Sequence, residues 1–363
     1  MSFYFDQRLA FAETLPSRVY FDQQNLEVEQ QRIFQRTPQM VGRLDQVAHP
    51  GSYFTADVSG QSVLVVRDSA GVLRGFHNVC RHRAGPVACG SGRRQVLQCG
   101  YHGWTYSLDG RLLGTPDFDG VENFTRETMG LHPVHVETWE QFIFVSLDGE
   151  PGLHQFLGDI LPERTVHAKV AAMKFVERRE YFIDCNWKVY VDNYVEGYHI
   201  PIVHPSLMKE LDYEHYRTLT GRYHSLQDAP IRGGGGPDRR YQPSDSQTEA
   251  LYFWMFPNLM LNVYPDNLST NLIVPLGPER TVTIFEWFFH DTESDEAQEA
   301  ISGTLALSDE IQLEDIAICE AVQRGLRSSA YDRGRYSVKR ENGLHHFHSL
   351  WHEFMSAGET GSR

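Results

Sequence analysis

The sequence predicts an α+β protein in which a small all-β domain precedes a larger α+β domain. Residues 37–150 contain short apolar runs separated by turn residues, the pattern of consecutive strands. Residues 151–363 combine aromatic-rich strand candidates with helical patterns. The length of 363 residues is sufficient for two such domains. We expect residues 1–36 to form an N-terminal arm that packs on the second domain.

The elements expected up to residue 150 follow from local signals in the order of the chain. The arm carries one helical stretch, "NLEVEQQRIFQRT". The stretch "SVLVVRDSAGVLRGFHNV" predicts two strands joined by a turn at Ser69-Ala70-Gly71. The stretch "WTYSLDGRLLGTP" predicts a hairpin centred on Asp109-Gly110. The apolar strand "QFIFVSLDGEPG" ends in a Gly/Pro break, which places the first domain boundary near residue 150.

The second domain is expected to alternate helices, strands and one long loop. Residues Trp187–Tyr198 fit a helix that Pro201 prevents from continuing. Residues 226–247 include four consecutive glycines and predict a mobile surface loop without a phosphate-binding frame. The stretches "LYFWMFPNLMLNVY" and "TVTIFEWFFH" are strand candidates. A helix is expected over residues 293–327, with an apolar face made of Leu313, Ile316, Ile318 and Val322.

Composition excludes several classes of protein. With 41% hydrophobic and 22% charged residues, a packed globular protein is expected. The formal net charge of −15 argues against a nucleic-acid binder. No signal peptide and no apolar run of about 18 residues is present, so we expect a cytoplasmic protein that does not cross a membrane. The chain has five cysteines: Cys80, Cys89, Cys99, Cys185 and Cys319. This odd number is a poor disulfide framework, so the cysteines that cluster with histidines are interpreted as metal ligands.

A first group of metal ligands lies in "CRHRAGPVACGSGRRQVLQCGYHGW". It contains Cys80-x-His82 and, sixteen residues later, Cys99-x-x-His102. Two cysteines and two histidines can close one tetrahedral zinc site, or hold the two irons of a [2Fe–2S] cluster. One residue between Cys80 and His82 is tight for a single metal, so the spacing favours the iron–sulfur interpretation. Cys89 lies off the pattern, and we expect a packed thiol.

A second group lies in "DNYVEGYHIPIVHP", which concentrates Asp192, Glu196, His199 and His204. On a helix, Glu196 and His199 share a face, and Asp192 lies two turns before His199 on the same side. Two histidines beside acids indicate a two-histidine, one-carboxylate iron(II) site. Spacing alone leaves the third ligand open between Asp192, Glu196 and a distant acid.

Both groups resemble the motifs of Rieske non-heme iron oxygenase α subunits, the ring-hydroxylating type of oxygenase. The resemblance implies an N-terminal all-β Rieske domain and a C-terminal α+β domain with a helix-grip, START-like fold and an antiparallel sheet. It implies that a [2Fe–2S] cluster is held by Cys80, His82, Cys99 and His102. It also implies a mononuclear Fe(II) held by His199, His204 and Asp315. The last ligand comes from "QLEDIAICEAVQRGL", in which Glu314 is the non-ligating neighbour.

The resemblance further implies how electrons travel. In the family, the acid at position 196 is not a ligand but bridges an iron histidine to a Rieske histidine of the neighbouring subunit. Glu196 would therefore link His199 to His102 across a subunit boundary in a homotrimer. Asp192 is expected to orient the histidines by hydrogen bonds. Arg81, Arg83, Arg93 and Arg94 either serve solubility or form a basic collar that docks an acidic electron donor.

The resemblance is strongest to the branch that acts on choline, glycine betaine and carnitine. We therefore expect a terminal monooxygenase that takes electrons from NAD(P)H through a separate ferredoxin- or flavin-type reductase. With O2, it would hydroxylate a C–H bond beside a quaternary ammonium nitrogen, either in N-demethylation or in choline oxidation. Tyr194, Trp254 and Tyr264 are candidates to contact this small molecule. The alternatives are an aromatic-ring dioxygenase or demethylase with the same metals, and a zinc-stabilised binding module without redox activity.

Overall fold

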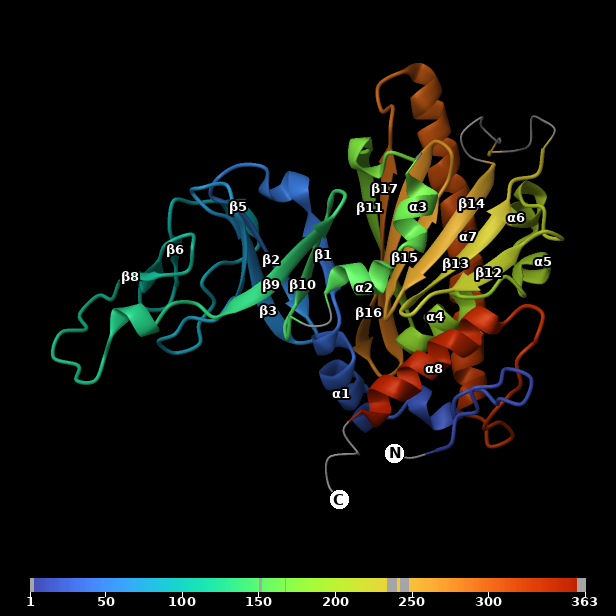
Figure 1. Ribbon diagram of the computed structural model, residues 1–363, viewed down its shortest axis with the longest axis horizontal. Coiled ribbons are helices and arrows are strands. Elements are labelled where there is room, and N and C mark those ends of the chain that lie inside the picture. Colours follow the sequence, from blue (N-terminus) through green and yellow to red (C-terminus); the bar gives the residue numbers. More distant parts are fainter. Residues whose placement is uncertain (1–2, 150–151, 167, 234–239, 242–247, 358–363) are drawn as a thin grey trace. The chain divides into compact units, whose positions relative to one another are not determined.

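The computed structural model describes residues 3–149, 152–166, 168–233, 240–241 and 248–357. These residues form two compact units. The small unit is Phe34–Leu153, and the large unit combines Met1–Ile33 with His154–Arg363. The chain therefore leaves the large unit after its first segment, builds the small unit, and returns (Figure 1).

The small unit is all-β apart from short 3-10 turns. Seven antiparallel strands have the order β1-β10-β9-β4-β3-β2-β5, and a separate three-stranded sheet has the order β6-β7-β8. The strands are β1 (Gln39–Arg43), β2 (Ser52–Val58), β3 (Gln61–Arg67), β4 (Leu73–His77), β5 (Ser91–Arg93), β6 (Leu97–Gln98), β7 (Thr105–Tyr106), β8 (Leu112–Gly114), β9 (Pro133–Trp139) and β10 (Phe142–Ser146). The turn at Ser69-Ala70-Gly71 and the hairpin at Asp109-Gly110 are confirmed.

The large unit is built on one antiparallel sheet with the order β11-β17-β16-β15-β14-β13-β12. Its strands are β11 (Lys174–Ile183), β12 (Arg217–Thr220), β13 (His224–Pro230), β14 (Glu249–Met255), β15 (Leu259–Val263), β16 (Asn267–Gly277) and β17 (Arg280–Phe289). The predicted aromatic strands are thus confirmed, and they bury Trp254, Trp287 and Phe288. The loop predicted over residues 226–247 begins too early, because β13 continues to Pro230 and pairs with β14. Residues 234–239 and 242–247 of that prediction lie outside the described residues.

Helices complete the large unit around the sheet. They are α1 (Gln23–Arg32), α2 (Leu153–Leu157), α3 (Ile160–Thr165), α4 (Trp187–Tyr194), α5 (Ile200–Val203), α6 (Pro205–Glu210), α7 (Asp295–Leu326) and α8 (Asn342–Ser356). The long helix α7 lies against the sheet (Figure 1), where Ile301 and Leu305 pack on Phe285, Trp287 and Phe289 of β17. α1 packs on α8, and this contact ties the N-terminal segment to the large unit.

The apolar face predicted for α7 is wrong. Leu313, Ile318 and Val322 are exposed, with 61%, 37% and 44% of their surface accessible, and Ile316 is only half-buried. The buried face instead includes Gln312 and Gln323. Gln312 donates to Thr283 at 3.0 Å, and Gln323 accepts from the Asn186 amide at 2.9 Å. Hydrogen bonding allows these amides to be buried, a possibility that a count of apolar positions does not register.

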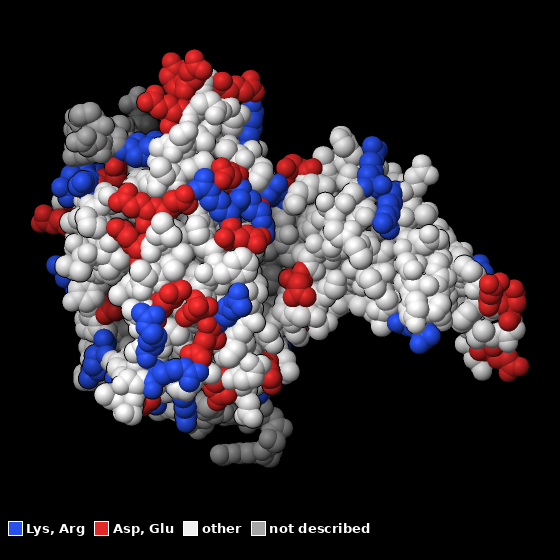
Figure 2. Space-filling model, turned by 180° about the vertical axis from the view of Figure 1, so that it is seen from behind, with Lys and Arg blue, Asp and Glu red and all other residues white. Residues whose placement is uncertain are grey.

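The excess negative charge does not form a surface of one sign on the visible face of the large unit. Figure 2 shows acidic and basic side chains intermingled there. Among the described residues, no helix is both long and apolar enough to cross a membrane.

Candidate metal centres

The two Cys/His pairs meet in the small unit, on the loops that follow β4 and β6. Cys80 and Cys99 are buried, and the rings of His82 and His102 lie 4.6 Å apart, centroid to centroid. His82 stacks on Trp104 at 4.9 Å, and its buried Nδ1 atom has no hydrogen-bond partner among the described residues. A buried ring nitrogen without a partner is expected of a metal ligand. The residues present therefore fit a [2Fe–2S] cluster of the Rieske type.

Three neighbouring features bear on whether the two Cys/His pairs can hold a cluster. A Cβ at Gly85 would lie 3.1 Å from Cys99 Sγ, so glycine allows its loop to approach the ligand atoms closely. His102 is exposed, and desolvation, His82 and Arg83 together lower its pKa, which favours the neutral, metal-binding imidazole. Cys89 is exposed rather than packed, so that prediction is wrong, and it stays outside the ligand set.

The arginines around the motif differ in their surroundings. Arg83 lies over the Tyr101 ring at 5.4 Å, and Arg94 lies over the Tyr53 ring at 5.3 Å. Arg81 donates to the Gly130 carbonyl at 2.9 Å and so fixes the loop that carries Cys80. Arg83, Arg93 and Arg94 remain exposed.

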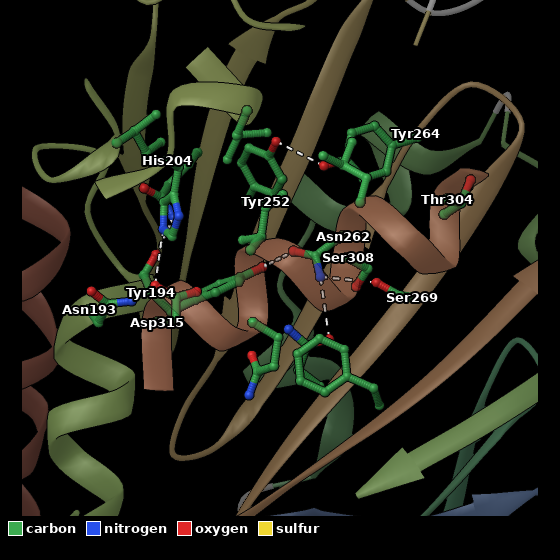
Figure 3. A pocket seen from close by; sticks show the side chains of 18 of the residues that line it. Asn193, Tyr194, His204, Tyr252, Asn262, Tyr264, Ser269, Thr304, Ser308 and Asp315 are labelled. Atoms are coloured by element: carbon green, nitrogen blue, oxygen red, sulfur yellow. Dashed lines mark hydrogen bonds and ion pairs between the residues drawn. The ribbon is translucent and has the colours of Figure 1, made fainter. Parts of the chain in front are cut away.

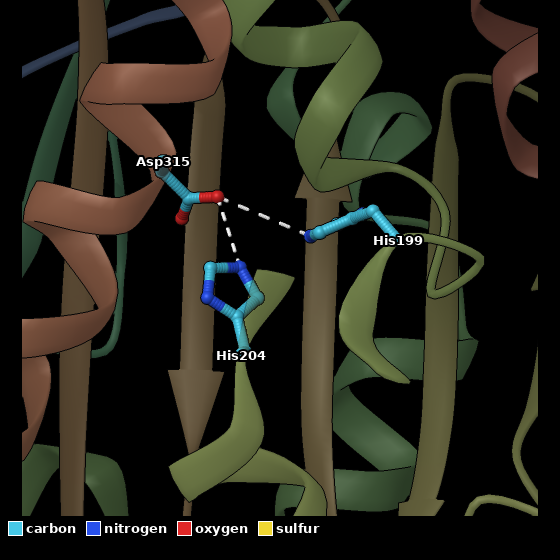
Figure 4. Close-up of side chains that lie close together, drawn as sticks. All are labelled: His199, His204 and Asp315. Carbon is cyan, nitrogen blue, oxygen red and sulfur yellow. Dashed lines mark hydrogen bonds and ion pairs between the residues drawn. The ribbon is translucent and has the colours of Figure 1, made fainter. Parts of the chain in front are cut away.

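The second group of ligands is assembled in the large unit from the α4–α6 region and α7. Ligand atoms of His199, His204 and Asp315 all lie within 4.8 Å of one another (Figure 4). Asp315 Oδ1 is 3.0 Å from His204 Nε2 and 3.9 Å from His199 Nε2. Asn193 donates to the same oxygen at 2.6 Å. Two imidazoles and one carboxylate on one side of a point can hold Fe(II) and leave other positions open.

Carboxylates hold the far nitrogens of both histidines. Glu196 Oε1 lies 2.7 Å from His199 Nδ1, and Glu314 Oε2 lies 2.7 Å from His204 Nδ1. Such partners fix the imidazole tautomer so that Nε2 is free for a metal. Burial lowers the pKa of His204, but hydrogen bonds with Asp315 and Glu314 outweigh burial and raise it. The contact of Glu314 was missed by sequence reasoning, which treated it only as the neighbour of a ligand.

The helix predicted over Trp187–Tyr198 is four residues too long. α4 ends at Tyr194, whose carbonyl accepts a hydrogen bond from Gln227 at 2.6 Å. A turn follows, in which a Cβ at Gly197 would come within 2.8 Å of the Tyr216 ring. Glu196 and His199 thus meet through this turn and not along a helix face. Pro201 lies in the first turn of α5 instead of terminating α4.

The expectation that Asp192 orients the iron histidines is not met. Its carboxylate accepts from Tyr20 at 2.8 Å and lies 2.9 Å from His348 Nε2. Tyr336 contacts the other nitrogen of His348 at 2.6 Å. Asp192 therefore belongs to a buried network that joins η1 (Ser17–Tyr20), α4 and α8. The helical spacing that suggested otherwise is interrupted after Tyr194.

A cavity opens onto the His199, His204 and Asp315 side chains and is rich in tyrosines (Figure 3). Six tyrosines line it: Tyr190, Tyr194, Tyr216, Tyr241, Tyr252 and Tyr264. The Tyr194 hydroxyl donates to Asn262 at 2.9 Å, and the Tyr252 and Tyr264 hydroxyls lie 3.0 Å apart. Burial raises the pKa of all six phenols, so they stay neutral.

Two of the three predicted substrate contacts line this cavity. Tyr194 and Tyr264 do, whereas Trp254 is fully buried, packs on Phe256 and Phe347, and donates to the Pro257 carbonyl at 3.1 Å. Trp287, on β17, contributes the indole that faces the cavity. Trp254 is two residues from the cavity-lining Tyr252 on β14 and so shares its face of the sheet, but it lies further along the strand, where it packs against Phe347 of α8.

A Rieske-type cluster site and a two-histidine, one-carboxylate site in one chain define the class of Rieske oxygenases. Comparison with known families supports the assignment to this class. Residues 37–125 match the model of the Rieske [2Fe-2S] domain, and residues 170–357 match that of the ring hydroxylating alpha subunit (catalytic domain). The chain belongs to the Rieske non-heme iron oxygenase α subunits. It is an oxygenase that uses a [2Fe–2S] cluster and a mononuclear iron, and the expected fold is confirmed.

Individual relatives cover nearly the whole chain. Choline monooxygenase, chloroplastic, of Arabidopsis thaliana is 38% identical over 353 residues, covering 94% of this chain and 82% of that protein. The carnitine monooxygenase oxygenase subunit of Escherichia coli (strain K12) is 31% identical, with 93% of each chain covered. A solved quaternary ammonium Rieske monooxygenase in complex with L-carnitine superimposes with a TM-score of 0.83 at 28% identity, over 97% of this chain and 98% of that chain.

Proposed function

We propose that this chain is the terminal oxygenase of a two-component monooxygenase that hydroxylates a C–H bond beside a quaternary ammonium nitrogen. The observation that carries this proposal is the tyrosine-lined cavity at the iron site. Neutral aromatic faces attract alkylammonium groups, and desolvation strengthens the attraction. The described residues that line the cavity include no Lys or Arg, whereas Glu196 and Asp315 supply negative charge at the metal end. The relatives named for choline and carnitine support the same substrate class.

In this proposal, Cys80, His82, Cys99 and His102 hold the cluster, and His199, His204 and Asp315 hold the iron. When bound, the cluster would supply electrons and the iron would supply the chemistry that activates O2. Glu196 and Glu314 keep both iron histidines oriented, and the tyrosines hold the cation. The overall reaction consumes the C–H bond, O2, two electrons and two protons, and it yields a C–OH group and water. A hydroxylated N-methyl group then breaks down to formaldehyde and the demethylated amine, whereas hydroxylated choline is an aldehyde hydrate.

We further propose that electrons enter from a ferredoxin- or flavin-type reductase that oxidises NAD(P)H, and pass between subunits of a homotrimer. Glu196, bonded to His199, would accept from the partner subunit's His102. Exposed apolar side chains near the iron ligands support a second copy as the occupant of this surface. Tyr198, Ile202 and Leu313 have exposed fractions of 56%, 85% and 61%. A similar solved structure is described as giving insights into inter-subunit electron transfer.

Coupled turnover tests the proposed substrate class. The reconstituted oxygenase and reductase would be incubated with choline, glycine betaine, carnitine and naphthalene, while O2 uptake and products are measured. We expect stoichiometric formaldehyde or aldehyde with at least one cationic amine. The proposal fails if no cationic amine couples to O2 uptake, and ring hydroxylation of naphthalene would replace it with an aromatic substrate. A Tyr264→Phe variant keeps the ring and serves as a control for Tyr264→Leu, which should raise KM.

A further inference from the structure

A row of side chains crosses the sheet of the large unit and forms one wall of the tyrosine-rich cavity. The residues that pair directly with one another across strands β13 to β17 are Gln227, Tyr252, Asn262, Ser269 and Trp287. All five line the cavity. The row is therefore polar at Asn262 and Ser269, with an aromatic ring on either side.

Asn262 fixes the direction of the hydrogen bonds in this polar part of the wall (Figure 3). Its Oδ1 accepts from the Tyr194 hydroxyl at 2.9 Å. Its Nδ2 donates to Ser269 Oγ at 3.0 Å and to Asn271 Oδ1 at 3.3 Å. Ser269 and Asn271 thus receive hydrogen bonds from the wall, and their own hydrogens remain available.

These hydrogens have no acceptor within the wall. Among the described residues, neither the Ser269 hydroxyl nor the Asn271 Nδ2 group donates to another side chain or to a carbonyl. An amide Nδ2 group can only donate. Both residues lie on the same face of β16 and line the cavity, and only 6% of Ser269 and 3% of Asn271 is exposed. We call Ser269 and Asn271 the donor pair. Buried donors without a partner are costly, so the donor pair favours a ligand that brings an acceptor.

Other polar groups of the cavity are engaged with their neighbours. The Tyr252 and Tyr264 hydroxyls lie 3.0 Å apart, and the Thr304 hydroxyl donates to the Ala300 carbonyl at 2.9 Å. These groups complete their hydrogen bonds without a ligand. The donor pair does not, and this difference indicates a binding function for it.

We propose that the donor pair binds an acceptor oxygen of the substrate, a hydroxyl or carboxylate oxygen carried on the carbon chain of the quaternary ammonium ion. The aromatic rings of the cavity take the ammonium group, and the donor pair fixes the other end of the same molecule. The inference rests on the proposed function and narrows it. A tetraalkylammonium ion without such an oxygen would fit the rings but leave both donors unpaired.

The donor pair is also fixed relative to the proposed iron ligands. Tyr194, whose hydroxyl holds Asn262, is the last residue of α4. The preceding residue, Asn193, donates to Asp315 at 2.6 Å. One helix end thus contacts both the wall that carries the donor pair and a proposed iron ligand. An oxygen bound by the donor pair would therefore set the position of the rest of the substrate relative to the iron.

Binding of matched ligands tests the proposal. Choline and propyltrimethylammonium differ only in a hydroxyl that replaces a methyl group, and glycine betaine carries a carboxylate instead. Isothermal titration calorimetry with the full-length holoprotein gives the dissociation constants. We expect choline or glycine betaine to bind about tenfold more tightly than propyltrimethylammonium, the effect of one well-placed hydrogen bond. The tighter of the two identifies the kind of oxygen that is bound.

Variants assign this preference to the donor pair. Asn271→Leu should abolish the preference and leave the dissociation constant of propyltrimethylammonium within about twofold. Ser269→Ala, a smaller change that keeps the test valid if Asn271→Leu does not fold, should reduce the preference in the same direction. Thr304→Val is the matched control, because it also removes a cavity hydroxyl, one that is occupied by the Ala300 carbonyl and by Arg240 Nε at 2.7 Å. It should keep the wild-type preference.

The outcomes separate this inference from the proposed function. Equal binding of the three ligands to wild type, a preference that survives in Ser269→Ala and in folded Asn271→Leu, or an equal loss of preference in Thr304→Val would overturn the inference. Each of these results leaves a cation site in place and the proposed function intact. If none of the three cations binds to the wild-type holoprotein, the proposed function fails and this inference fails with it.

Discussion

At the scale of single residues, His204 is held at both ring nitrogens by neighbouring residues of α7. Glu314 approaches Nδ1 and Asp315 approaches Nε2, at 2.7 Å and 3.0 Å. Successive helix residues point about 100° apart, so the imidazole must lie between the two side chains. One helix thus supplies both a proposed iron ligand and the group that orients another ligand.

Substituting Glu314 by Gln should weaken iron binding without removing a ligand. The amide cannot hold the His204 tautomer as the carboxylate does, and loss of such a partner typically costs about 10–100-fold in metal affinity. Iron affinity is measured by titrating the metal-depleted mononuclear site, while the Rieske EPR signal reports an intact cluster. Glu310→Gln is the matched control, because Glu310 lies on the same helix and accepts from Ser206. Equal affinities in Glu314→Gln and Glu310→Gln would refute the role of Glu314.

Individual residues also show which features of the site the sequence predicts and which it does not. His199 and His204 were found because they lie beside acids in one short motif, and Asp315 was found only through the resemblance to the family; the structure brings the three together. The contact of Glu314 depends on how α7 is rotated against the 199–204 segment, and no local signal reports that rotation. Asp192 was assigned to the wrong partners because a helix was continued past Tyr194. The wrong end predicted for this helix therefore led to a wrong role for Asp192.

At the scale of elements, Glu29 of α1 binds two other helices of the large unit. Its carboxylate accepts from Lys188 Nζ at 2.7 Å and from Trp187 Nε1 at 2.8 Å, both on α4. It also accepts from Trp351 Nε1 of α8 at 2.7 Å. Glu29 and Lys188 are both fully buried. α4 leads directly into the turn that carries Glu196 and His199, so this contact supports the metal site from a distance.

Removal of the Glu29 charge should destabilise the large unit strongly. Glu29→Gln leaves Lys188 buried without a counter-charge, a change that typically costs about 3–5 kcal/mol of unfolding free energy. Thermal and denaturant unfolding of the holoprotein measure it, with the exposed Glu27→Gln on the same helix as control. The double variant Glu29→Gln, Lys188→Met should recover part of the loss. If Glu29→Gln unfolds like wild type, the buried pair contributes little.

A buried histidine on α8 gives the large unit a defined response to acid. Burial, with His224 and Arg222 adding to it, lowers the pKa of His346 to about 4 from an ordinary value of 6.5. The unfolded chain therefore binds a proton that the folded chain does not between these two values. The associated stability is complete above pH 6.5 and is lost as the pH falls towards 4, by about 1–3 kcal/mol.

Unfolding free energies at pH 7 and pH 4.5 test this response. His346→Gln should lose less stability than wild type over that interval, because the titrating group is gone. His215→Gln, a change at an exposed histidine, should lose as much as wild type. Identical losses in wild type and His346→Gln would contradict the assignment of this histidine as a source of the acid response.

The sequence predicts the strands and turns better than the buried face of α7, and the difference has a physical reason. Strands and turns such as the Ser69-Ala70-Gly71 turn have local causes and were found. The buried face of α7 was not, because Gln312 and Gln323 are buried by hydrogen bonds to distant segments. Apolar Leu313 and Val322 are exposed in the single chain. A pattern of hydrophobicity does not distinguish a face that meets the chain's own core from one that can meet another subunit.

At the scale of the whole molecule, the proposed route of electrons predicts complementation between subunits. A Cys80→Ala, His82→Ala chain lacks the proposed cluster ligands, and an Asp315→Ala chain lacks a proposed iron ligand. Each variant alone should be inactive. Mixed trimers, coexpressed with two different affinity tags and purified over both, should regain part of the turnover, since one subunit's cluster can serve the next subunit's iron.

The mixed trimers decide between transfer within a chain and transfer between chains. Absence of turnover in doubly purified trimers that contain both metals would exclude transfer between subunits. Analytical ultracentrifugation supplies the oligomeric state directly, and wild-type trimers mixed in the same way serve as the control for coexpression.

The large unit is discontinuous in sequence, and this affects the order in which the protein is made. The ribosome completes the small unit, Phe34–Leu153, when the large unit has only its first 33 residues. The Glu29 carboxylate can reach its full set of partners only after Trp187, Lys188 and Trp351 have been synthesised. Domains generally fold as units during synthesis, N-terminal ones first. The polypeptide that carries the proposed cluster ligands is therefore complete before the residues that form the proposed iron site have been synthesised.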